Sequence, residues 1–351
     1  MARIVVAGAG AAGASVAYHL ALLGARDVVL CDVRGVAGGS TSRAMGGVRQ
    51  QFSTAAEVRL AQASIRFFAE LGQPLFQQVG YLFLATTEEG LAALDVRREL
   101  QASLGVPVEQ VDPREVPGLA VDDVLGAVTC RQDGIADPPG VCREMVRRAA
   151  ERGVEVREHV DAVEVGGDVL VLACGPWSRE VGERVGVDLP IRPLCRQLVD
   201  TEPVAGLPGA LPMVIEAETG FHFRPTPTGG LRLAMGEATP RWGFETDVAE
   251  PLVDDWLERL AHRYPPAAGV GVQRAWAGLY DMTPDAHPIL GEVADGVYAA
   301  CGFSGHGFMQ SPAVGQALAE EILHGGSELD LSPFRLDRFA GDLVFPETLV
   351  L

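Results

Sequence analysis

The chain has 351 residues, 48% of them hydrophobic and 21% charged, and is long enough for two domains or one large one. Its 28 basic and 47 acidic residues give a formal net charge of −19, which argues against nucleic acid or an anionic membrane as a partner. All of the basic residues are arginines, so no lysine is available as a general base, and no apolar run reaches the roughly 18 residues of a membrane span.

The first thirty-two residues predict a strand, a glycine-rich turn, a helix and a second strand. Residues 3–7 form a short β-branched run typical of a buried strand, and GAGAAG follows at 8–13. Residues 14–24 have the spacing of a helix, and 27–32 read as the second strand. This order is the context in which a GxGxxG motif indicates a dinucleotide site.

Each glycine of that motif has a physical role in binding a dinucleotide. Gly8 allows the tight turn, Gly10 lets a pyrophosphate approach the backbone, and Gly13 lets the helix pack closely on the strand. The helix N-terminus offers free N–H groups to the phosphates. Asp32 can accept hydrogen bonds from ribose hydroxyls, and its charge disfavours a 2′-phosphate. A strand–helix–strand unit without ligand remains the alternative.

The segment after the second strand decides between NAD and FAD. Residues 38–52, GGSTSRAMGGVRQQF, are rich in glycine and hydroxyl groups and are suited to wrap a second length of cofactor. This run resembles the flavin-contacting segment of the D-amino-acid oxidase and sarcosine oxidase family of FAD enzymes. Three later stretches resemble that family in the same order, at 168–178, 276–291 and 299–323.

The resemblance implies an α/β (mixed α+β) fold with a Rossmann-like FAD-binding domain interleaved with an antiparallel-sheet substrate domain. We assign the discontinuous FAD-binding domain to 1–78, 132–185 and 282–351, and the substrate domain to 79–131 and 186–281. In the substrate domain the turn-bounded apolar runs predict strands, at 79–86, 126–130, 191–200, 211–217, 220–225 and 230–236. The segment around 155–168 is shorter than in the family.

The resemblance also implies a set of residues that contact FAD in the four motifs. They are Gly8, Gly10, Ala11, Ala12, Gly13, Asp32, Val33, Arg34, Ser40, Thr41, Ser42, Arg43, Met45, Gly46, Gly47, Val160, Ala173, Cys174, Gly175, Trp177, Gly302, Phe303, Ser304, Gly305, His306, Gly307, Phe308 and Met309.

The flavin is expected to be noncovalent FAD, because the residues that tether it in some relatives are replaced here. Gly278 stands where those relatives have a cysteine, and Ser42 and Arg43 stand where others have a histidine.

The stretch GFSGHGFMQSP, 302–312, is expected to lie against the flavin ring. Its glycines remove side chains so that backbone can approach a flat surface. We expect a helix to begin near Ser311 and Pro312 and to aim its N-terminus at the reduced ring. His306 is expected to be a hydrogen-bonding residue of the loop rather than a catalytic base.

Arg49 is the first candidate anchor for the substrate carboxylate, and a structural salt bridge is the alternative role. Arg49 matches the arginine that pairs with the carboxylate in monomeric sarcosine oxidases, and an arginine fork meets a carboxylate bidentately. The second anchor is open: Met309 stands where those oxidases have a lysine, and Tyr280 stands where D-amino-acid and glycine oxidases have an arginine. His222 and Arg224 are expected on opposite faces of a strand, so that one of them faces the pocket.

Oxygen use is a further open point. Oxidases of the sarcosine type use a lysine near flavin N5 to activate oxygen, and the matching place here is Arg232 or Ala234. Arg232 at the flavin would supply the missing charge, whereas Ala234 would favour a dehydrogenase.

The resemblance implies hydride transfer from the C–N bond of a small amino acid or secondary amine to flavin N5, which gives an imine. O2 is the expected acceptor. The alternatives are a dehydrogenase that passes electrons to another subunit or carrier, and a noncatalytic FAD-binding assembly protein. A homo-oligomer is left open.

The six cysteines lack the spacing of a metal site or a CxxC motif. They are expected to be buried thiols of a cytoplasmic protein without a bound metal.

Overall fold

The computed structural model describes residues 2–341 and 346–351, and its N-terminal unit has the predicted order. Strand β1 (Ile4–Ala7) is buried along its whole length, helix α1 (Ala11–Leu22) follows the glycine turn, and β2 (Val28–Asp32) runs parallel to β1. Apolar residues on both faces of β1 explain why it lies in the middle of a sheet.

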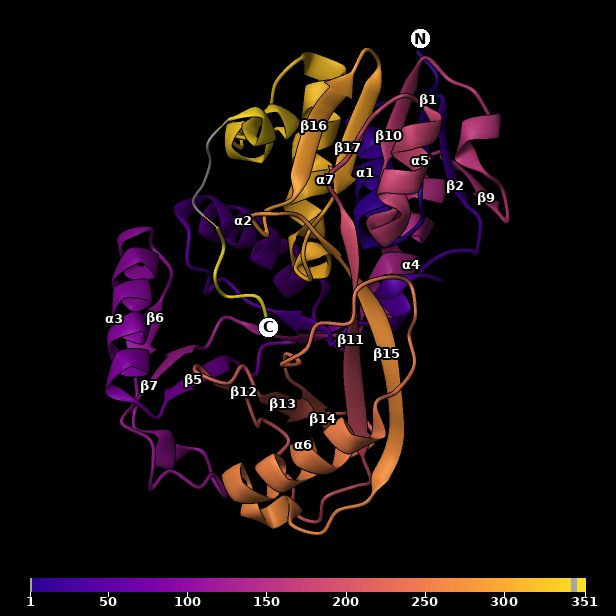
Figure 1. Cartoon of the computed structure of the whole chain (residues 1–351). Coiled ribbons are helices and arrows are strands. Elements are labelled where there is room, and N and C mark those ends of the chain that lie inside the picture. The colour runs from indigo at the N-terminus through magenta and orange to yellow at the C-terminus, as the bar shows by residue number, and fades with distance from the viewer. Residues whose placement is uncertain (1, 342–345) are drawn as a thin grey trace.

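That sheet has six strands in the order β16-β17-β10-β1-β2-β9. Its other strands come from two later parts of the chain, with β9 at Glu155–Glu158, β10 at Val169–Leu172, β16 at Ile289–Ala294 and β17 at Val297–Cys301. All neighbours are parallel except β16, which pairs antiparallel with β17. Three distant segments therefore build one layer (Figure 1).

Helices cover this sheet and form its largest core. Helix α1 packs against α4 (Pro138–Ala150) and α7 (Gly307–His324), and α7 also packs against α2 (Ala55–Leu71). The short helix α5 (Ser178–Arg184) follows β10. The apolar faces of the four longer helices share one cluster with β1 and β2.

A second, eight-stranded sheet has the order β15-β11-β14-β13-β12-β5-β7-β6. Its strands are β5 (Tyr81–Ala85), β6 (Val108–Gln110), β7 (Gly126–Cys130), β11 (Arg192–Thr201), β12 (Met213–Glu216), β13 (His222–Pro225), β14 (Leu231–Ala234) and β15 (Val272–Met282). The pairing is antiparallel apart from the parallel neighbours β5 and β12. Helices α3 (Glu88–Ser103) and α6 (Glu250–Arg263) accompany it.

The remaining elements are a small sheet and seven 3-10 helices in the described part of the chain. A three-stranded sheet joins β3 (Gly47–Val48), β8 (Gly134–Ala136) and β4 (Phe76–Gln77). Short 3-10 helices lie at η1 (Ser40–Arg43), η2 (Pro113–Glu115), η3 (Ala162–Glu164), η4 (Gly175–Trp177), η5 (Pro265–Ala267), η6 (Ser332–Phe334) and η7 (Leu336–Ala340). In Figure 1 the long strands β11 and β15 extend from the six-stranded layer down into the second sheet. The domain boundaries themselves stay a prediction.

The predicted start of the last helix was wrong. Helix α7 begins at Gly307, so Pro312 lies inside it rather than in its first turn. Proline lacks the N–H that would bond the carbonyl four residues earlier. Here the Ser311 hydroxyl donates to that Phe308 carbonyl at 2.9 Å, and this bond explains how the helix continues through the proline.

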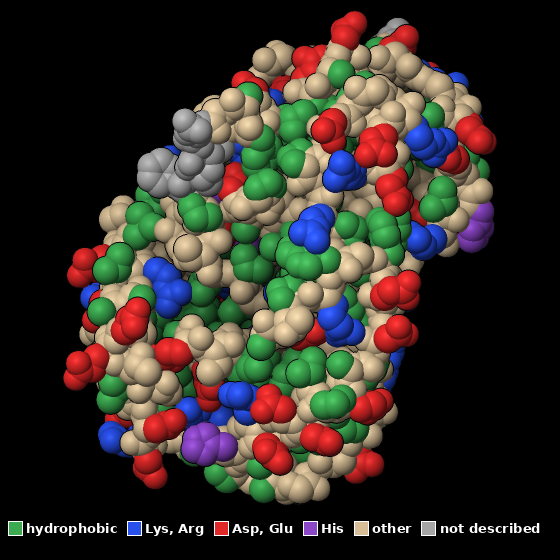
Figure 2. Space-filling model, in the orientation of Figure 1, with side chains coloured by type: hydrophobic (Ala, Val, Ile, Leu, Met, Phe, Trp, Pro, Cys, Tyr) green, Lys and Arg blue, Asp and Glu red, His purple; other side chains and the backbone are tan. Residues whose placement is uncertain are grey.

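Acidic and basic side chains are interspersed on the face shown in Figure 2, which has no broad basic patch. In the described part of the chain, no helix combines the length and the apolar character that crossing a membrane requires. Among the same residues, no group of three or more His, Cys, Asp or Glu side chains is arranged to hold a metal ion. All six cysteines are free thiols.

Candidate functional site

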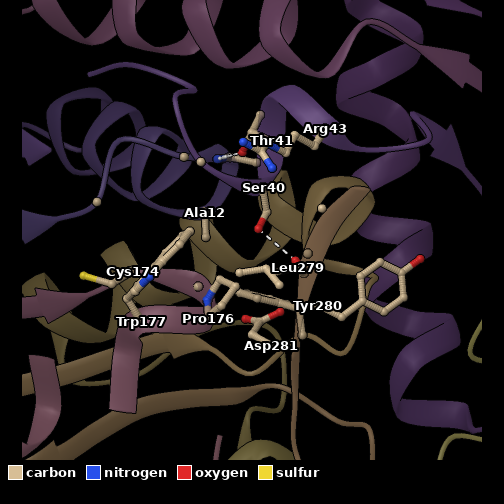
Figure 3. A pocket seen from close by; sticks show the side chains of 18 of the residues that line it. Ala12, Ser40, Thr41, Arg43, Cys174, Pro176, Trp177, Leu279, Tyr280 and Asp281 are labelled. Atoms are coloured by element: carbon tan, nitrogen blue, oxygen red, sulfur yellow. Dashed lines mark hydrogen bonds between the residues drawn. The ribbon is translucent and has the colours of Figure 1, made fainter. Parts of the chain in front are cut away.

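A cavity of about 450 Å³ lies where the two sheets meet. Its walls come from the β1–α1 turn, η1, η4, strands β11, β13, β14 and β15, and the loop before α7. Figure 3 labels side chains from α1, η1, η4 and β15 around it. Most of the predicted FAD contacts line it, namely Gly8, Gly10, Ala11, Ala12, Asp32, Val33, Arg34, Ser40, Thr41, Arg43, Met45, Val160, Ala173, Cys174, Gly175, Trp177, Phe303, Gly305, Gly307 and Phe308. The others lie outside its lining, namely Gly13, Ser42, Gly46, Gly47, Gly302, Ser304, His306 and Met309.

The β1–α1 turn needs its glycines for close backbone packing. Gly8 has a φ of +103°, and a Cβ placed there would lie 2.3 Å from the carbonyl oxygen of Ala173. A Cβ on Gly13 would lie 1.8 Å from the carbonyl oxygen of Gly8. These contacts bring the start of α1 against β1 and β10, which leaves the helix N-terminus facing the cavity.

Asp32 ends β2 with its carboxylate held by backbone amides. One oxygen accepts from the Ala9 N–H at 2.8 Å, and the other accepts from the N–H groups of Arg34 at 2.7 Å and Gly35 at 3.0 Å. The backbone of Val160, whose N–H donates to the Asp32 carbonyl at 3.1 Å, lies beside it. The carboxylate is therefore fixed at the cavity wall and keeps lone pairs for hydroxyl donors.

The hydroxyl-rich segment is tied to two other elements. The Ser40 hydroxyl donates to the Leu279 carbonyl at 2.8 Å, and Thr41 Oγ1 accepts from the Ala11 N–H at 3.1 Å (Figure 3). Arg43 donates to the Ala277 carbonyl at 2.9 Å. Since these bonds connect η1 to α1 and β15, the segment forms a rigid wall between the two sheets.

The loop before α7 is shaped by contacts with neighbouring side chains. Gly302 has a φ of +74°, and a Cβ there would lie 2.5 Å from Thr283 Cγ2. Gly305 has a φ of +97°, and a Cβ there would lie 2.3 Å from Cε2 of Tyr280. The loop is also held by Asp281, whose carboxylate accepts from the Gly302 N–H at 2.7 Å. Burial raises the pKa of Asp281 to about 6.

Arg49 is buried next to the cavity, but it is not part of its lining. Its guanidinium donates to the carbonyl of Gln51, and to that of Leu349 at 2.6 Å. It stacks over the Phe52 ring at 4.2 Å, and its NH2 lies 3.4 Å from His306 Nε2. Burial lowers the pKa of Arg49. Its donors therefore bond backbone carbonyls, and a role as carboxylate anchor stays a prediction.

Tyr280 and His222 both line the cavity. The Tyr280 hydroxyl donates to the main-chain oxygen of Leu351 at 2.8 Å. His222 Nδ1 lies 2.8 Å from the Gly220 carbonyl, and burial lowers the pKa of His222 to about 4. The ring is neutral near pH 7, so Nδ1 donates to that carbonyl and Nε2 remains an acceptor.

The expectation that His222 and Arg224 lie on opposite faces was wrong. Residues two apart on a strand share a face. The Arg224 Nε donates to the Met45 carbonyl at 2.7 Å, so Arg224 supports the segment after η1 from the same side.

The choice between Arg232 and Ala234 is clear in the structure. Arg232 pairs bidentately with Asp200, at 2.7 Å and 2.8 Å, and does not line the cavity. Ala234 does line it. Met309, the residue at the expected lysine position, is buried in the helical core instead of the cavity wall.

Other lining residues were not named from the sequence. They are Ala7, Cys31, Gly39, Ala44, Asp161, Ala162, Pro176, Glu180, Val181, Arg184, Arg196, Gln197, Leu198, Met235, Leu279, Asp281, Ala300 and Leu351. Most of them flank the recognised motifs and could have been found by extending those motifs. Arg196, Gln197 and Leu198 are different, because the pairing of β11 with β15 places them at the cavity.

Residues 3–321 match the protein family described as FAD dependent oxidoreductase, DAO. Mitochondrial sarcosine dehydrogenase of Mus musculus is 29% identical over 383 residues, covering 96% of this chain and 41% of that protein. Glycine oxidase of Geobacillus kaustophilus is 26% identical over 372 residues, covering 96% of this chain and 97% of that protein. The crystal structure of L-proline dehydrogenase from P. horikoshii has a TM-score of 0.89 and 29% identity, covering 96% of this chain and 97% of that one.

The fraction of each relative's length that aligns with this chain differs. The chain spans less than half of the length of the sarcosine dehydrogenase, but nearly all of the glycine oxidase and of the proline dehydrogenase structure. The similarity therefore extends over both sheets and the cavity between them.

Proposed function

Because the chain belongs to the FAD dependent oxidoreductase family, we propose that it oxidises the C–N bond of a small amino acid or secondary amine, such as sarcosine, proline or glycine, to an imine. FAD is the cofactor, and when bound it supplies the acceptor for the hydride that leaves the carbon next to nitrogen. The relatives named as sarcosine dehydrogenase, glycine oxidase and proline dehydrogenase support this substrate class.

The cavity residues suit FAD along its length. Asp32 offers acceptors to the ribose hydroxyls, and the N-terminus of α1 offers N–H groups to the pyrophosphate. Gly305 and Gly307 would hold the loop at the flavin, and the N-terminus of α7 would stabilise negative charge there. Noncovalent attachment remains our proposal, because Gly278, Ser42 and Arg43 offer no thiol or imidazole at the expected tether positions.

The observation that carries the proposal is the packing of Tyr280 against Gly305 at one wall of a cavity that His222 also lines. The Tyr280 ring occupies the space that a Cβ on Gly305 would need. The loop before α7 and the cavity wall that carries Tyr280 are therefore packed directly against each other. The neutral His222 Nε2 can accept a hydrogen bond from the substrate amine. An amine that is held neutral needs no strong base to release hydride.

The identity of the electron acceptor forms a second part of the proposal. O2 is the acceptor expected from the oxidases of the family. Ala234 at the cavity favours the second candidate, a dehydrogenase that passes electrons to a carrier, because no cationic group stands at that place to stabilise reduced oxygen. Arg232, the other residue considered there, is neutralised by Asp200.

The test is to mix the holoenzyme anaerobically with sarcosine, L-proline and glycine and to follow flavin absorbance. Bleaching by at least one of them is expected. No bleaching by any amine or amino acid would favour the noncatalytic assembly protein instead. Admitting air to the reduced enzyme then separates the acceptors, since rapid reoxidation would contradict the dehydrogenase.

A further inference from the structure

Arg196 is a cation in the cavity wall that contacts no described acid. It lies on β11, opposite Gly278 of β15, and lines the cavity together with Leu198. Its Nε and NH1 atoms are buried, and neither has a hydrogen-bond partner among the residues that the structure describes. Burying guanidinium donors without an acceptor is costly, so the arrangement indicates that a ligand supplies the acceptor.

Three other arginines at or near the cavity bond protein oxygens. Arg49 donates to the carbonyls of Gln51 and Leu349. Arg43 donates to the Ala277 carbonyl at 2.9 Å. Arg232 is paired with Asp200 at 2.7 Å. Arg184 and Arg34 also line the cavity, but Arg184 pairs with Asp161 at 2.7 Å and Arg34 stacks over the Trp177 ring at 3.8 Å. Among the cavity arginines that the structure describes, Arg196 is the one with buried guanidinium donors that lack a partner.

The surroundings of Arg196 fit a small carboxylate. Its Cζ lies 5.6 Å from the centre of the Tyr280 ring, and that ring packs against Gly305, which places the charge on the tyrosine side of the cavity, near the loop before α7. Neither His222 nor Asp281 is an ion-pair partner of the guanidinium, since His222 is neutral and the buried Nε and NH1 of Arg196 bond no described residue. A guanidinium in a cavity with few competing acceptors favours a carboxylate over a neutral group.

We propose that Arg196 binds the carboxylate of the substrate, so that the substrate is an amino acid rather than a simple amine. This inference rests on the proposed function, and it assigns to Arg196 the role that the sequence suggested for Arg49. The substrate amine then lies toward His222 Nε2, with the oxidised carbon between the two groups.

The test uses the holoenzyme and two probes of the same shape, acetate and acetamide. Binding is followed as a change in the flavin absorbance spectrum. We expect Arg196→Gln to weaken acetate binding by about tenfold or more, because a charge-assisted hydrogen bond is lost. Acetamide binding is expected to be unchanged, and Arg196→Lys is expected to keep part of the acetate affinity.

Arg192→Gln is the matched control, because Arg192 is exposed on the same strand and stacks over Trp242 at 4.2 Å. It should bind acetate like the wild type. Retained FAD content and an unchanged flavin spectrum in the absence of probe show that each variant is folded.

Several results would overturn the inference. They are unaltered acetate affinity in Arg196→Gln, an equal loss for acetamide, an equal loss in Arg192→Gln, and a wild type whose spectrum does not respond to acetate. A shifted flavin reduction potential with normal acetate binding would also overturn it, since Arg196 would then contact the flavin. The substrate panel tests the proposed function separately. If a substrate bleaches the flavin but Arg196→Gln binds acetate normally, the proposed function stands and the inference on Arg196 falls. If Arg196→Gln loses acetate binding but no substrate bleaches the flavin, the proposed function falls and the carboxylate site at Arg196 stands.

Discussion

The Arg49 guanidinium donates to the Leu349 carbonyl at 2.6 Å, across 300 positions of sequence. The bond ties the segment after η1 to the described residues 346–351. Glu347 reinforces the connection, because its carboxylate accepts from the Ser53 hydroxyl at 2.7 Å. Arg49 therefore holds together two parts of the chain that flank the cavity.

Replacing Arg49 by methionine is expected to destabilise the fold. The substitution leaves the Gln51 and Leu349 carbonyls without their donor, and unpaired buried acceptors cost about 1–3 kcal/mol each. We expect the free energy of unfolding in urea to fall by about 2–4 kcal/mol. Arg66→Gln, at an exposed site of α2, is the control and should change it by less than about 0.5 kcal/mol. A stability like that of the wild type would show that these bonds contribute little.

The local elements of the fold could be predicted from the sequence. Strand β7 lies at 126–130 as expected, and Asp32 ends β2 beside the glycine turn. These features depend on residues close together in the chain, whose period and turn chemistry are visible in the sequence.

The parts that could not be predicted depend on distant pairing. Arg196 reaches the cavity because β11 pairs with β15, and Arg49 is engaged because residue 349 folds back onto it. A resemblance to relatives indicates which position carries a functional side chain. It does not indicate which distant backbone carbonyl already accepts hydrogen bonds from that side chain. This explains why more of the cavity lining was named from the FAD motifs than from the strands of the second sheet.

Gly305→Ala is expected to cost more stability than the strain of its backbone conformation alone would. A Cβ there would lie 2.3 Å from Tyr280 Cε2, so the tyrosine must move in addition to the strain at a φ of +97°. We expect a loss of about 2–5 kcal/mol in the free energy of unfolding and an altered flavin spectrum. Gly269→Ala isolates the backbone strain, because Gly269 has a φ of +75° with open space around it. It should cost about 1 kcal/mol and leave the spectrum unchanged. Equal losses in the two variants would argue against the contact with Tyr280.

His222 is expected to make stability depend on pH. Its pKa is about 4 in the folded chain against 6.5 for a free histidine, because burial disfavours the charged ring. Between these values the unfolded chain binds a proton that the folded chain does not, so stability falls as pH falls. The contribution is fully present above 6.5 and is lost as pH falls toward 4.

Urea unfolding of the holoenzyme at about pH 7 and about pH 5 measures this effect. Relative to His222→Gln, the wild type should lose about 2 kcal/mol more between the two conditions. His324→Gln, at an exposed position near the end of α7, should behave like the wild type. Parallel losses in the wild type and His222→Gln would mean that another group carries the pH dependence.

Ala234→Lys is expected to raise the oxygen reactivity of the reduced enzyme. Ala234 lines the cavity, and the resemblance gives either Ala234 or Arg232 as the match for the lysine of sarcosine-type oxidases. No cationic residue of β14 belongs to the described cavity lining. A cation beside the flavin stabilises the negative charge that develops on oxygen, an effect worth about 3 kcal/mol or about 100-fold in rate. Ala234→Gln adds similar bulk without charge and should reoxidise at the wild-type rate. Stopped-flow mixing of the substrate-reduced variants with air-saturated buffer gives the rates directly. If the wild type already reoxidised as fast as Ala234→Lys, Ala234 would not limit oxygen use, and O2 rather than a carrier would be the physiological acceptor.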